Sequence, residues 1–317
     1  MIKKSYMPTL VIIILSFIWG STWIAIKFGL EDLPPFLFGG SRFIIATLLV
    51  WLMMKAWKVT FPKDWESWKI MLILGLAQAG DYVFVFWGEQ YISGGLGAIL
   101  FATMPFFVVI LNYFMADEHA IEPVQIIGIV VSFIGVVLIF IKDMSLSDNS
   151  ILGGLAIIAA SICGAFISVY AKLHANNIHS ITNTFTQMMV SAAVLCGMGL
   201  VSEDIGKFNL TMNGALSILY LGLFGSAIAF VLYMWVIKKV SVIEASVIPL
   251  TTPIAAVVLG WAMRGEEMGI NVIAGGVLIL AGVYLVNILK TQLMFRRKIA
   301  VTAEPAEVAD VVNEAKI

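Results

Sequence analysis

The sequence predicts an all-α membrane protein of ten transmembrane helices, arranged as two inverted five-helix repeats. Three observations predict this fold class. The chain is 61% hydrophobic and only 12% charged, whereas soluble domains are about 45–50% apolar and ~25% charged. Its apolar runs are long enough to cross a bilayer. The second half of the chain also repeats features of the first half at a fixed spacing.

The apolar runs define the expected spans, because a helix needs about 20 mostly apolar residues to cross a membrane. The first run is too long for a signal-peptide core and no small-residue cleavage site follows it, so we interpret it as a retained span. The segment 299–317 is rich in alanines and acids and is expected to be a disordered cytoplasmic tail. The expected spans are 9–28, 35–54, 69–91, 95–115, 124–141, 152–172, 181–201, 213–237, 243–263 and 270–289.

The distribution of basic residues predicts the orientation. With residues 1–8 as a cytoplasmic N-terminus, the inside segments carry fourteen Lys and Arg residues and the outside loops carry three. Cytoplasmic loops of membrane proteins are enriched in Lys and Arg. We therefore expect a multi-pass protein of the cell (inner) membrane with both termini in the cytoplasm.

Two stretches, 95–135 and 241–282, carry the repeat. A shift of 148 residues places Pro105 on Pro253 and Glu118 on Glu266. Weaker matches extend the unit to five helices, which divides the chain into repeats 9–141 and 152–289. Because five is an odd number, the second repeat enters the membrane from the opposite side, which is typical of secondary transporters. A passive scaffold is the alternative outcome of such a duplication.

Several classes of chemistry receive no support from the sequence. The formal net charge of -1 argues against a nucleic-acid partner. Cys163 and Cys196 lie within apolar runs and are interpreted as small core residues. The three histidines lack a Cys or His partner at metal-ligand spacing, and no Gly-x-x-x-x-Gly-Lys-Ser/Thr loop occurs. The sequence therefore predicts no metal, no cofactor and no catalytic residue.

A set of motifs resembles the drug/metabolite transporter superfamily, specifically its EamA-type ten-helix exporters. These motifs are Trp19-Gly20-Ser21 followed by Lys27, Arg42-Phe43, Pro105 to Glu118 with Gly128 and Gly135, and their echo at Pro253, Glu266 and Gly282. The resemblance covers about residues 9–290. It implies two EamA-type repeats and a solute transporter, commonly an exporter of amino acids, metabolites or drugs. It also implies a central cavity lined mainly by helices 1, 3, 4, 6, 8 and 9.

The third expected helix carries the most informative polar residues. Gln78, Asp81, Tyr82, Val85 and Glu89 share one helical face. Asp81 lies near mid-span, where an ionisable side chain usually faces a bundle interior or water. The functional interpretation is a proton-coupling or cation-binding acid. The alternative is a fixed ion pair with Lys27 or Arg42, which makes these two basic residues candidates for coupling as well.

The first expected helix presents Trp19, Trp23 and Lys27 on one face with small residues between them. Two indoles and a cation are suited to an amphipathic or aromatic solute, although an ordinary helix contact is the alternative. Hydroxyls within spans are often bonded to their own backbone. The candidate substrate-binding residues are Trp19, Trp23, Gln78, Asp81, Tyr82, Thr103, Phe106, Ser168, Tyr233 and Thr252.

Pro105 and Pro253 are expected to kink their helices, because each leaves a carbonyl four residues earlier without its helical donor. Such a kink either lines a wet cavity or is satisfied by packing. Glu118 and Glu266 end two helices and are interpreted as gate residues or as partners for a helix N-terminus. Glycines seven residues apart in the fifth and tenth helices predict close helix packing and leave a homodimer as an alternative.

The function that these features predict is a secondary transporter that lies in the lipid bilayer and exports a small organic solute. Its driving force would be the solute gradient or a proton gradient acting through Asp81. The alternatives are a membrane channel or uncoupled facilitator. A membrane-embedded enzyme would need a clustered His/Asp/Glu set or an activated nucleophile, and the sequence contains no such pattern.

Overall fold

The computed structural model describes residues 7–116, 123–142, 148–240, 245 and 247–285, and every regular element in this part of the chain is a helix. The all-helical prediction is therefore confirmed. The predicted tail 299–317, residues 1–6 and Glu118 lie outside the described residues. The helices are α1 (Met7–Leu30), α2 (Pro35–Ala56), α3 (Trp65–Glu89), α4 (Gly94–Phe101), α5 (Met104–Met115), α6 (Pro123–Lys142), α7 (Asp148–His174), α8 (Ser180–Ser202), η1 (Ile205–Lys207), α9 (Met212–Tyr220), η2 (Leu221–Ile228), α10 (Ala229–Val236), α12 (Val247–Arg264) and α13 (Ile270–Tyr284).

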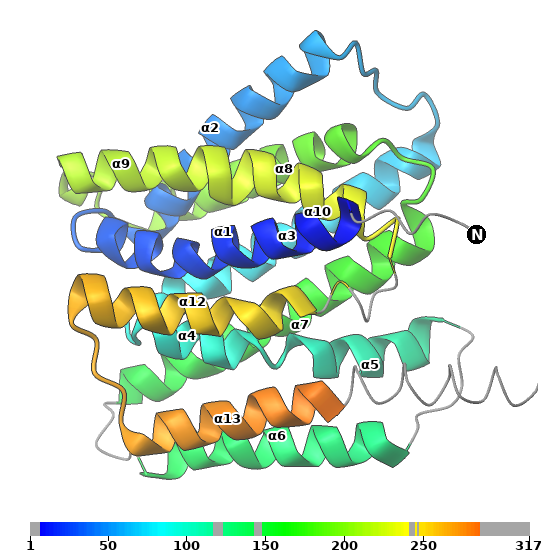
Figure 1. The fold of residues 1–317 in the computed structure, drawn as a ribbon. Coiled ribbons are helices and arrows are strands. Elements are labelled where there is room, and N and C mark those ends of the chain that lie inside the picture. The colour runs from blue at the N-terminus through cyan, green and yellow to red at the C-terminus, as the bar shows by residue number, and fades with distance from the viewer. Residues whose placement is uncertain (1–6, 117–122, 143–147, 241–244, 246, 286–317) are drawn as a thin grey trace, which may run out of the picture.

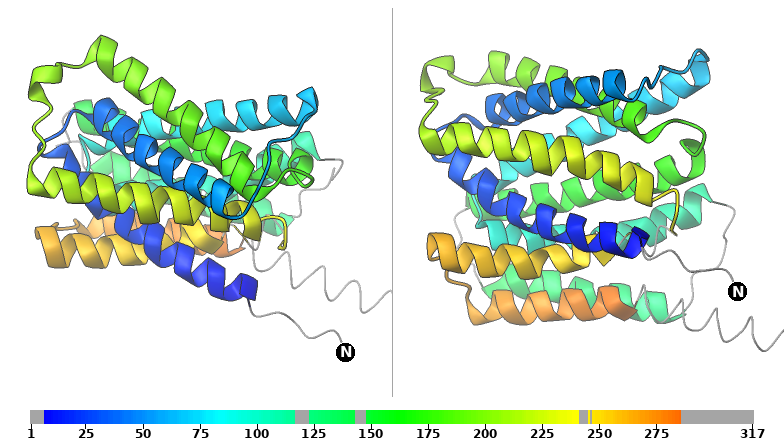
Figure 2. Two further views of the ribbon diagram at one scale, coloured as in Figure 1. Left: turned by 90° about the horizontal axis from the view of Figure 1, so that it is seen from above. Right: turned by 45° about the horizontal axis from the view of Figure 1, so that its top comes forward.

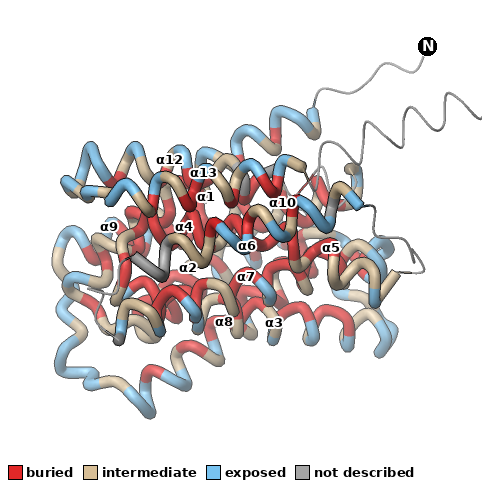
Figure 3. Tube along the Cα trace, turned by 90° about the horizontal axis from the view of Figure 1, so that it is seen from below, coloured by how far each residue is buried: buried red, intermediate tan, exposed pale blue. Residues whose placement is uncertain are grey.

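The surface of this bundle is suited to lipid. Seven segments of the described chain are long and apolar enough to cross a membrane, and the apolar stretches Ile126–Leu138 and Ile270–Tyr284 are shorter. Large apolar side chains such as Leu48, Phe133 and Trp261 are exposed. Figure 3 shows that buried residues gather in the middle of the bundle while exposed ones lie on its outward faces. Because a soluble monomer exposes few large apolar patches, the bundle is a membrane protein.

The helices lie side by side, with their long axes in roughly one direction (Figure 1). The pair α6 and α13 forms one edge, α2 and α8 pack together toward the other, and α3 packs on α7. The two further views in Figure 2 agree with this order. Helices α1, α4 and α12 lie in the central region, where they contact one another.

The structure corrects the prediction for Pro105. One kinked helix was expected over 95–115, but α4 ends at Phe101 and α5 begins at Met104, with Pro105 as its second residue. A proline ring clashes with the carbonyl four residues earlier, and that residue is Phe101. The chain therefore breaks at this point, and the Thr103 hydroxyl donates to the Leu100 carbonyl (2.7 Å).

Pro253, in contrast, lies inside the continuous helix α12. The carbonyl that it deprives of a helical donor belongs to Pro249. The hydroxyl of Thr252 donates to this carbonyl at 3.2 Å. A local side chain thus satisfies the freed backbone group, which is one of the ways in which proline is tolerated in a membrane helix.

The seven-spaced glycines pack α6 against α13 within the same chain. A Cβ atom on Gly135 would lie 2.5 Å from the Gly275 carbonyl oxygen, and one on Gly282 would overlap the Gly128 carbonyl and Ser132. The Ser132 hydroxyl also donates across the pair to the Ile279 carbonyl (3.0 Å). These glycines therefore serve close packing, and a homodimer would need another surface.

A histidine at the start of α8 predicts a pH dependence of stability. Nδ1 of His179 accepts from the Ile181 N–H (3.3 Å) as the N-cap of α8. Partial burial and the positive charge of Lys238 lower the pKa of His179, so the folded protein prefers the neutral ring. The stabilising contribution is fully present above the unfolded pKa of about 6.5 and is lost as the pH falls through the lower folded pKa.

We expect His179→Asn to flatten this part of the stability profile, because asparagine caps helices well and does not titrate. Thermal denaturation between about pH 5 and 7 measures the effect. An unchanged slope in the variant would assign the pH dependence to another group.

Candidate functional site

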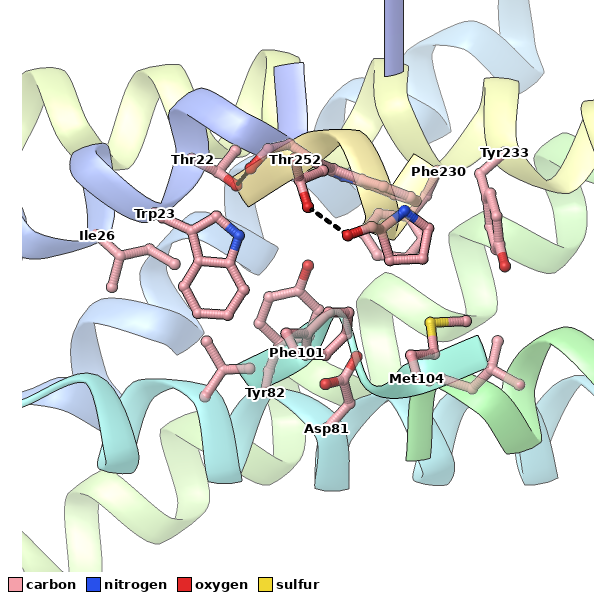
Figure 4. A pocket seen from close by; sticks show the side chains of 15 residues that line it. Thr22, Trp23, Ile26, Asp81, Tyr82, Phe101, Met104, Phe230, Tyr233 and Thr252 are labelled. Carbon is pink, nitrogen blue, oxygen red and sulfur yellow. Dashed lines mark hydrogen bonds between the residues drawn. The ribbon is translucent and has the colours of Figure 1, made fainter. Parts of the chain in front are cut away.

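A cavity of about 90 Å³ lies in the middle of the bundle. Its lining comes from α1, α3, α4, α5, α7, α10 and α12, which correspond to the first, third, fourth, sixth, eighth and ninth expected spans. Figure 4 shows these side chains pointing toward a common space. The lining residues are Trp19, Thr22, Trp23, Ile26, Asp81, Tyr82, Val85, Phe101, Met104, Gly164, Ile167, Phe230, Tyr233, Pro249 and Thr252.

Six of the fifteen residues that line the cavity are aromatic. The Trp19 ring lies 5.3 Å from Phe230 and 5.1 Å from Tyr233, measured between centroids. The Trp23 ring lies 5.7 Å from Phe101 in an edge-on arrangement. These contacts fall in the range of favourable aromatic pairs. The cavity is therefore a largely apolar chamber with a small number of polar groups.

Asp81 is the charged residue of this lining. It is 7% exposed, and its Oδ1 atom has no hydrogen-bond partner among the described residues. Figure 4 places its carboxyl below Tyr82 and directed toward the cavity. Asp81 forms no ion pair within the described part of the chain. The predicted fixed ion pair with Lys27 or Arg42 is therefore not formed.

Arg42 lies behind the cavity wall. Its side chain is 1% exposed, and its Nε and Nη2 atoms donate to the Ser226 hydroxyl at 3.0 and 2.8 Å. The guanidinium carbon lies 4.8 Å from the centre of the Tyr82 ring and 5.0 Å from that of Phe43. Ser226 belongs to the π-helical segment η2, an irregularity that often marks functional sites. Tyr82 separates Arg42 from the cavity.

Lys27 holds the end of another helix and does not line the cavity. Its Nζ atom donates to the carbonyls of Glu89 (2.8 Å) and Ile92 (3.0 Å), just where α3 ends. A cation is favourable at a helix C-terminus. Helical spacing predicted that Trp19, Trp23 and Lys27 would contact the solute together. In the structure only the two tryptophans of this set line the cavity.

Six of the ten predicted substrate-binding residues line the cavity, namely Trp19, Trp23, Asp81, Tyr82, Tyr233 and Thr252. The other four do not. Gln78 is fully buried, Thr103 shares a hydrogen bond with Ser161 (3.1 Å), and Phe106 packs with Val109. Ser168 lies behind Tyr233, with which it shares a hydrogen bond of 2.6 Å. The break before α5 changes which face of the chain meets the cavity, so helical spacing misplaced Phe106.

The model of the EamA-like transporter family matches the chain twice, over residues 7–141 and 151–288. The chain belongs to the EamA-like transporter family. It is therefore a member of the drug/metabolite transporter superfamily, and the resemblance inferred from its motifs is confirmed.

Similar proteins carry transporter names. This EamA-like chain is 28% identical over 276 residues to the uncharacterized transporter YoaV of Bacillus subtilis, which covers 86% of the chain and 94% of YoaV. It is 29% identical over 267 residues to the uncharacterized inner membrane transporter YedA of Escherichia coli K12, which covers 83% of the chain and 85% of YedA. A solved crystal structure matches with 17% sequence identity and a TM-score of 0.69. The match covers 92% of this chain and 99% of the chain in that structure, and it shows a similar fold alone.

Sequence reasoning missed several lining residues of this EamA-like protein. Phe230 lies three residues before Tyr233 on the same helical face, so spacing alone was a usable signal. Phe101 and Met104 flank the break between α4 and α5 and carried no such signal. Glu89 was placed on the informative face of α3 but not chosen, and both its carboxyl oxygens are buried without a partner among the described residues.

Proposed function

We propose that this EamA-like chain is a secondary transporter of the inner membrane that exports a small organic solute by alternating access. The solute classes are those of the family: amino acids, metabolites or drugs. The observation that carries the proposal is the cavity, because both predicted repeats line it and the buried carboxyl of Asp81 faces it. A site between two repeats near mid-membrane is the usual arrangement in secondary transporters.

Equivalent hydrogen bonds in the two repeats support an inverted duplication. Lys27 donates to the carbonyls of Glu89 and Ile92, and Lys172 donates to those of Ile237 and Val240. The two pairs of carbonyls are related by the 148-residue shift found in the sequence. A second pair of hydrogen bonds follows the same shift. The Thr103 hydroxyl donates to the Leu100 carbonyl, and the Thr251 hydroxyl donates to the Ile248 carbonyl.

Helix pairing points to the same symmetry. The second helix of each predicted repeat pairs with its counterpart, α2 with α8, and the fifth helices α6 and α13 do likewise. A two-fold relation in the membrane plane produces such self-pairs. With α4 and α5 counted as one span and α9, η2 and α10 as another, the described helices correspond to the ten predicted spans. An even number of spans would place both termini on one side of the membrane, which the predicted orientation makes the cytoplasmic side.

We propose that one end of the cavity is closed by a cluster that we name the outer clasp, formed by Glu31, Gly94, Gly95, Arg264 and Glu266. The Glu266 carboxylate accepts from the N–H groups of Gly94 and Gly95, each at 3.3 Å. Arg264 pairs with Glu31 at 2.6 Å and approaches Glu266 at 3.8 Å. Gly265, at a φ of 63°, turns the chain so that Glu266 reaches back to α4. Alternating access requires a closure of this kind that can open.

Proton coupling through Asp81 is the finer part of the proposal. Placing an unpaired carboxylate in a low-dielectric interior is costly, so Asp81 gains by binding either a proton or a cationic solute. If the Asp81 carboxyl binds a proton when the cavity opens to one side of the membrane and releases it when the cavity opens to the other, solute export would be coupled to the proton gradient. Lys27 and Arg42 would act on this step through helix position and local field, since neither faces the cavity.

The test is proton movement during solute efflux from vesicles that contain purified protein, with a panel beginning with amino acids. Wild type is expected to move protons with solute, whereas Asp81→Asn is expected to exchange solute without protons. Asp64→Asn is the matched control, because Asp64 caps the exposed N-terminus of the same helix by accepting from Ser67 and asparagine caps equally well.

Three results would change the assignment. Identical transport by wild type and Asp81→Asn would indicate an uncoupled facilitator. Non-saturable flux without counterflow would indicate a channel. Turnover of a solute into a product would indicate a membrane-embedded enzyme and would overturn the proposal.

A further inference from the structure

We propose that the cavity recognises a cationic ammonium group on a small apolar body, so that its substrates are amines and not amino acids or carboxylates. This inference rests on the proposed function and narrows its solute class. It follows from which polar groups of the lining are still free to bind a solute and which are already engaged.

Four of the neutral donors of the lining are engaged with the protein itself, whereas the Trp23 indole N–H and the Tyr82 hydroxyl donate to no protein group among the described residues. The Trp19 indole N–H donates to the Gly225 carbonyl (3.2 Å), and the Thr22 hydroxyl donates to the Trp19 carbonyl (2.7 Å). Tyr233 shares its hydroxyl with Ser168, and Thr252 donates to the Pro249 carbonyl. Figure 4 shows the last of these bonds at the cavity wall. These four groups shape the chamber but offer little to a polar solute.

Asp81 is the charged group left to bind, beside the Trp23 indole N–H and the Tyr82 hydroxyl. Its Oδ1 atom lacks a hydrogen-bond partner in the described part of the chain, although the residue is only 7% exposed. A buried polar atom normally has a partner. An ammonium group supplies three N–H donors together with the opposite charge, so it satisfies this carboxyl in a way that a neutral solute does not.

The surrounding rings favour the same ligand. Trp19, Tyr82 and Phe230 line the cavity with Asp81, and aromatic faces attract an organic cation. Trp23, Phe101 and Ile26 offer an apolar surface to the rest of the solute. The chamber therefore combines an acid, aromatic faces and an apolar end, which matches a hydrophobic amine.

A solute carboxylate finds no positively charged counterpart among the described residues of this lining. Arg42 is sealed behind Tyr82 and bonded to Ser226, and Lys27 is bonded to two carbonyls. No lysine, arginine or histidine occurs among the described residues that line the cavity. An amino acid would bury an unpaired carboxylate beside the Asp81 carboxylate, and both desolvation and like-charge repulsion oppose this.

The size of the cavity sets where the search for a ligand should begin. Its volume is about 90 Å³, smaller than the ~150 Å³ engineered cavity that admits benzene. A short branched amine is therefore the first probe. An aromatic amine would require side chains such as Met104, which is unbranched and adaptable, to move aside.

The test is calorimetric binding of a matched series to purified protein at neutral pH. The series is isopentylamine, leucine, 4-methylpentanoate and isopentanol, which share one alkyl body and differ in charge, and phenethylamine with phenylalanine forms a larger pair. Isopentylamine is expected to bind at least about tenfold more tightly than the other three, since an unsatisfied buried charged group costs more than ~1.4 kcal/mol.

Asp81→Asn is expected to weaken amine binding at least about tenfold and to leave isopentanol binding unchanged, while Asp64→Asn behaves as wild type. A thermal melt of each variant separates a binding defect from misfolding. If Asp81→Asn does not fold, the matched series on wild type still decides the outcome. Binding of leucine as tight as that of isopentylamine, tightest binding of 4-methylpentanoate, or no binding of either amine at millimolar concentration would each overturn the inference.

These outcomes are separable from failure of the proposed function, because binding is measured without transport. A protein that binds amines but does not exchange them across a vesicle membrane contradicts the transport proposal alone. A protein that exchanges amino acids by counterflow but binds no amine contradicts the amine assignment alone.

Discussion

Gly282→Val is expected to force α6 and α13 apart and to lower the stability of the protein. The Cβ atom alone would overlap the Gly128 carbonyl oxygen and the Ser132 side chain, and it would lie 2.8 Å from the Ser132 backbone nitrogen. Backbone atoms cannot move aside as a flexible side chain can. Overpacking costs about 1–3 kcal/mol, and the backbone contacts place this variant at the upper end of that range.

Thermal denaturation in detergent measures the effect, and Gly282→Ala provides a milder variant if the valine protein does not fold. Gly197→Ala is the control, because a Cβ atom on Gly197 of α8 meets nothing within 4 Å. That control should be neutral or slightly stabilising, since alanine favours a helix over glycine by about 0.5–1 kcal/mol. Equal melting temperatures for Gly282→Val and wild type would contradict the glycine-mediated packing of α6 on α13.

Glu266→Gln is expected to open the outer clasp. The carboxylate accepts two backbone N–H groups at the start of α4 and lies near Arg264. An amide oxygen is neutral and a weaker acceptor, so the N-terminus of α4 loses a charged partner. Hydrogen bonds to charged groups contribute about 1.5–3 kcal/mol, which corresponds to a roughly 10-fold to 100-fold shift toward the open form.

The measurement is labelling of Val85→Cys from outside with a membrane-impermeant thiol reagent, in a background without Cys163 and Cys196. Val85 lines the cavity, so its labelling rate reports access from the outer face. Glu266→Gln should raise this rate. Faster labelling from the cytoplasmic side instead would mean that the predicted orientation is reversed.

Glu203→Gln is the matched control for the clasp. Glu203 also caps a helix, since its carboxylate accepts from the N–H groups of Phe36 (2.7 Å) and Leu37 (2.9 Å) at the start of α2. This bond joins α2 to the end of α8, away from the cavity lining. The Glu203→Gln variant should lose a similar amount of stability, but the labelling rate of Val85→Cys should not change. An equal rise in labelling for both variants would mean that general loosening, and not the clasp, controls access.

Helical spacing located the part of the site that lies on uninterrupted helices. Asp81 and Tyr82 on α3, and Trp19 and Trp23 on α1, follow from a period of 3.6 residues, because the side chains of a regular helix share a face in a fixed way. The same reasoning failed for Phe106 and Thr103. The break at Pro105 restarts the helix, so angular positions before and after it are unrelated.

The partners of the buried charges could not be predicted from spacing. Lys27 and Arg42 were reasonable partners for Asp81, since all three lie in spans at compatible depths. Their real contacts, carbonyls at the end of α3 for Lys27 and Ser226 for Arg42, depend on side-chain direction and on which helices become neighbours. Glu266 likewise caps α4, a helix about 170 residues away in the sequence.

The amino-acid sequence alone predicts that the chain is helical, that it lies in a membrane and that it resembles a transporter family. Those properties depend on composition, run length and repeated motifs, which are local or periodic features of the chain. Which polar groups remain free in the cavity depends instead on how the helices pack. A hydroxyl or an indole N–H looks equally available in any sequence, and only the packed neighbours reveal that Trp19 and Tyr233 are engaged while Asp81 is not.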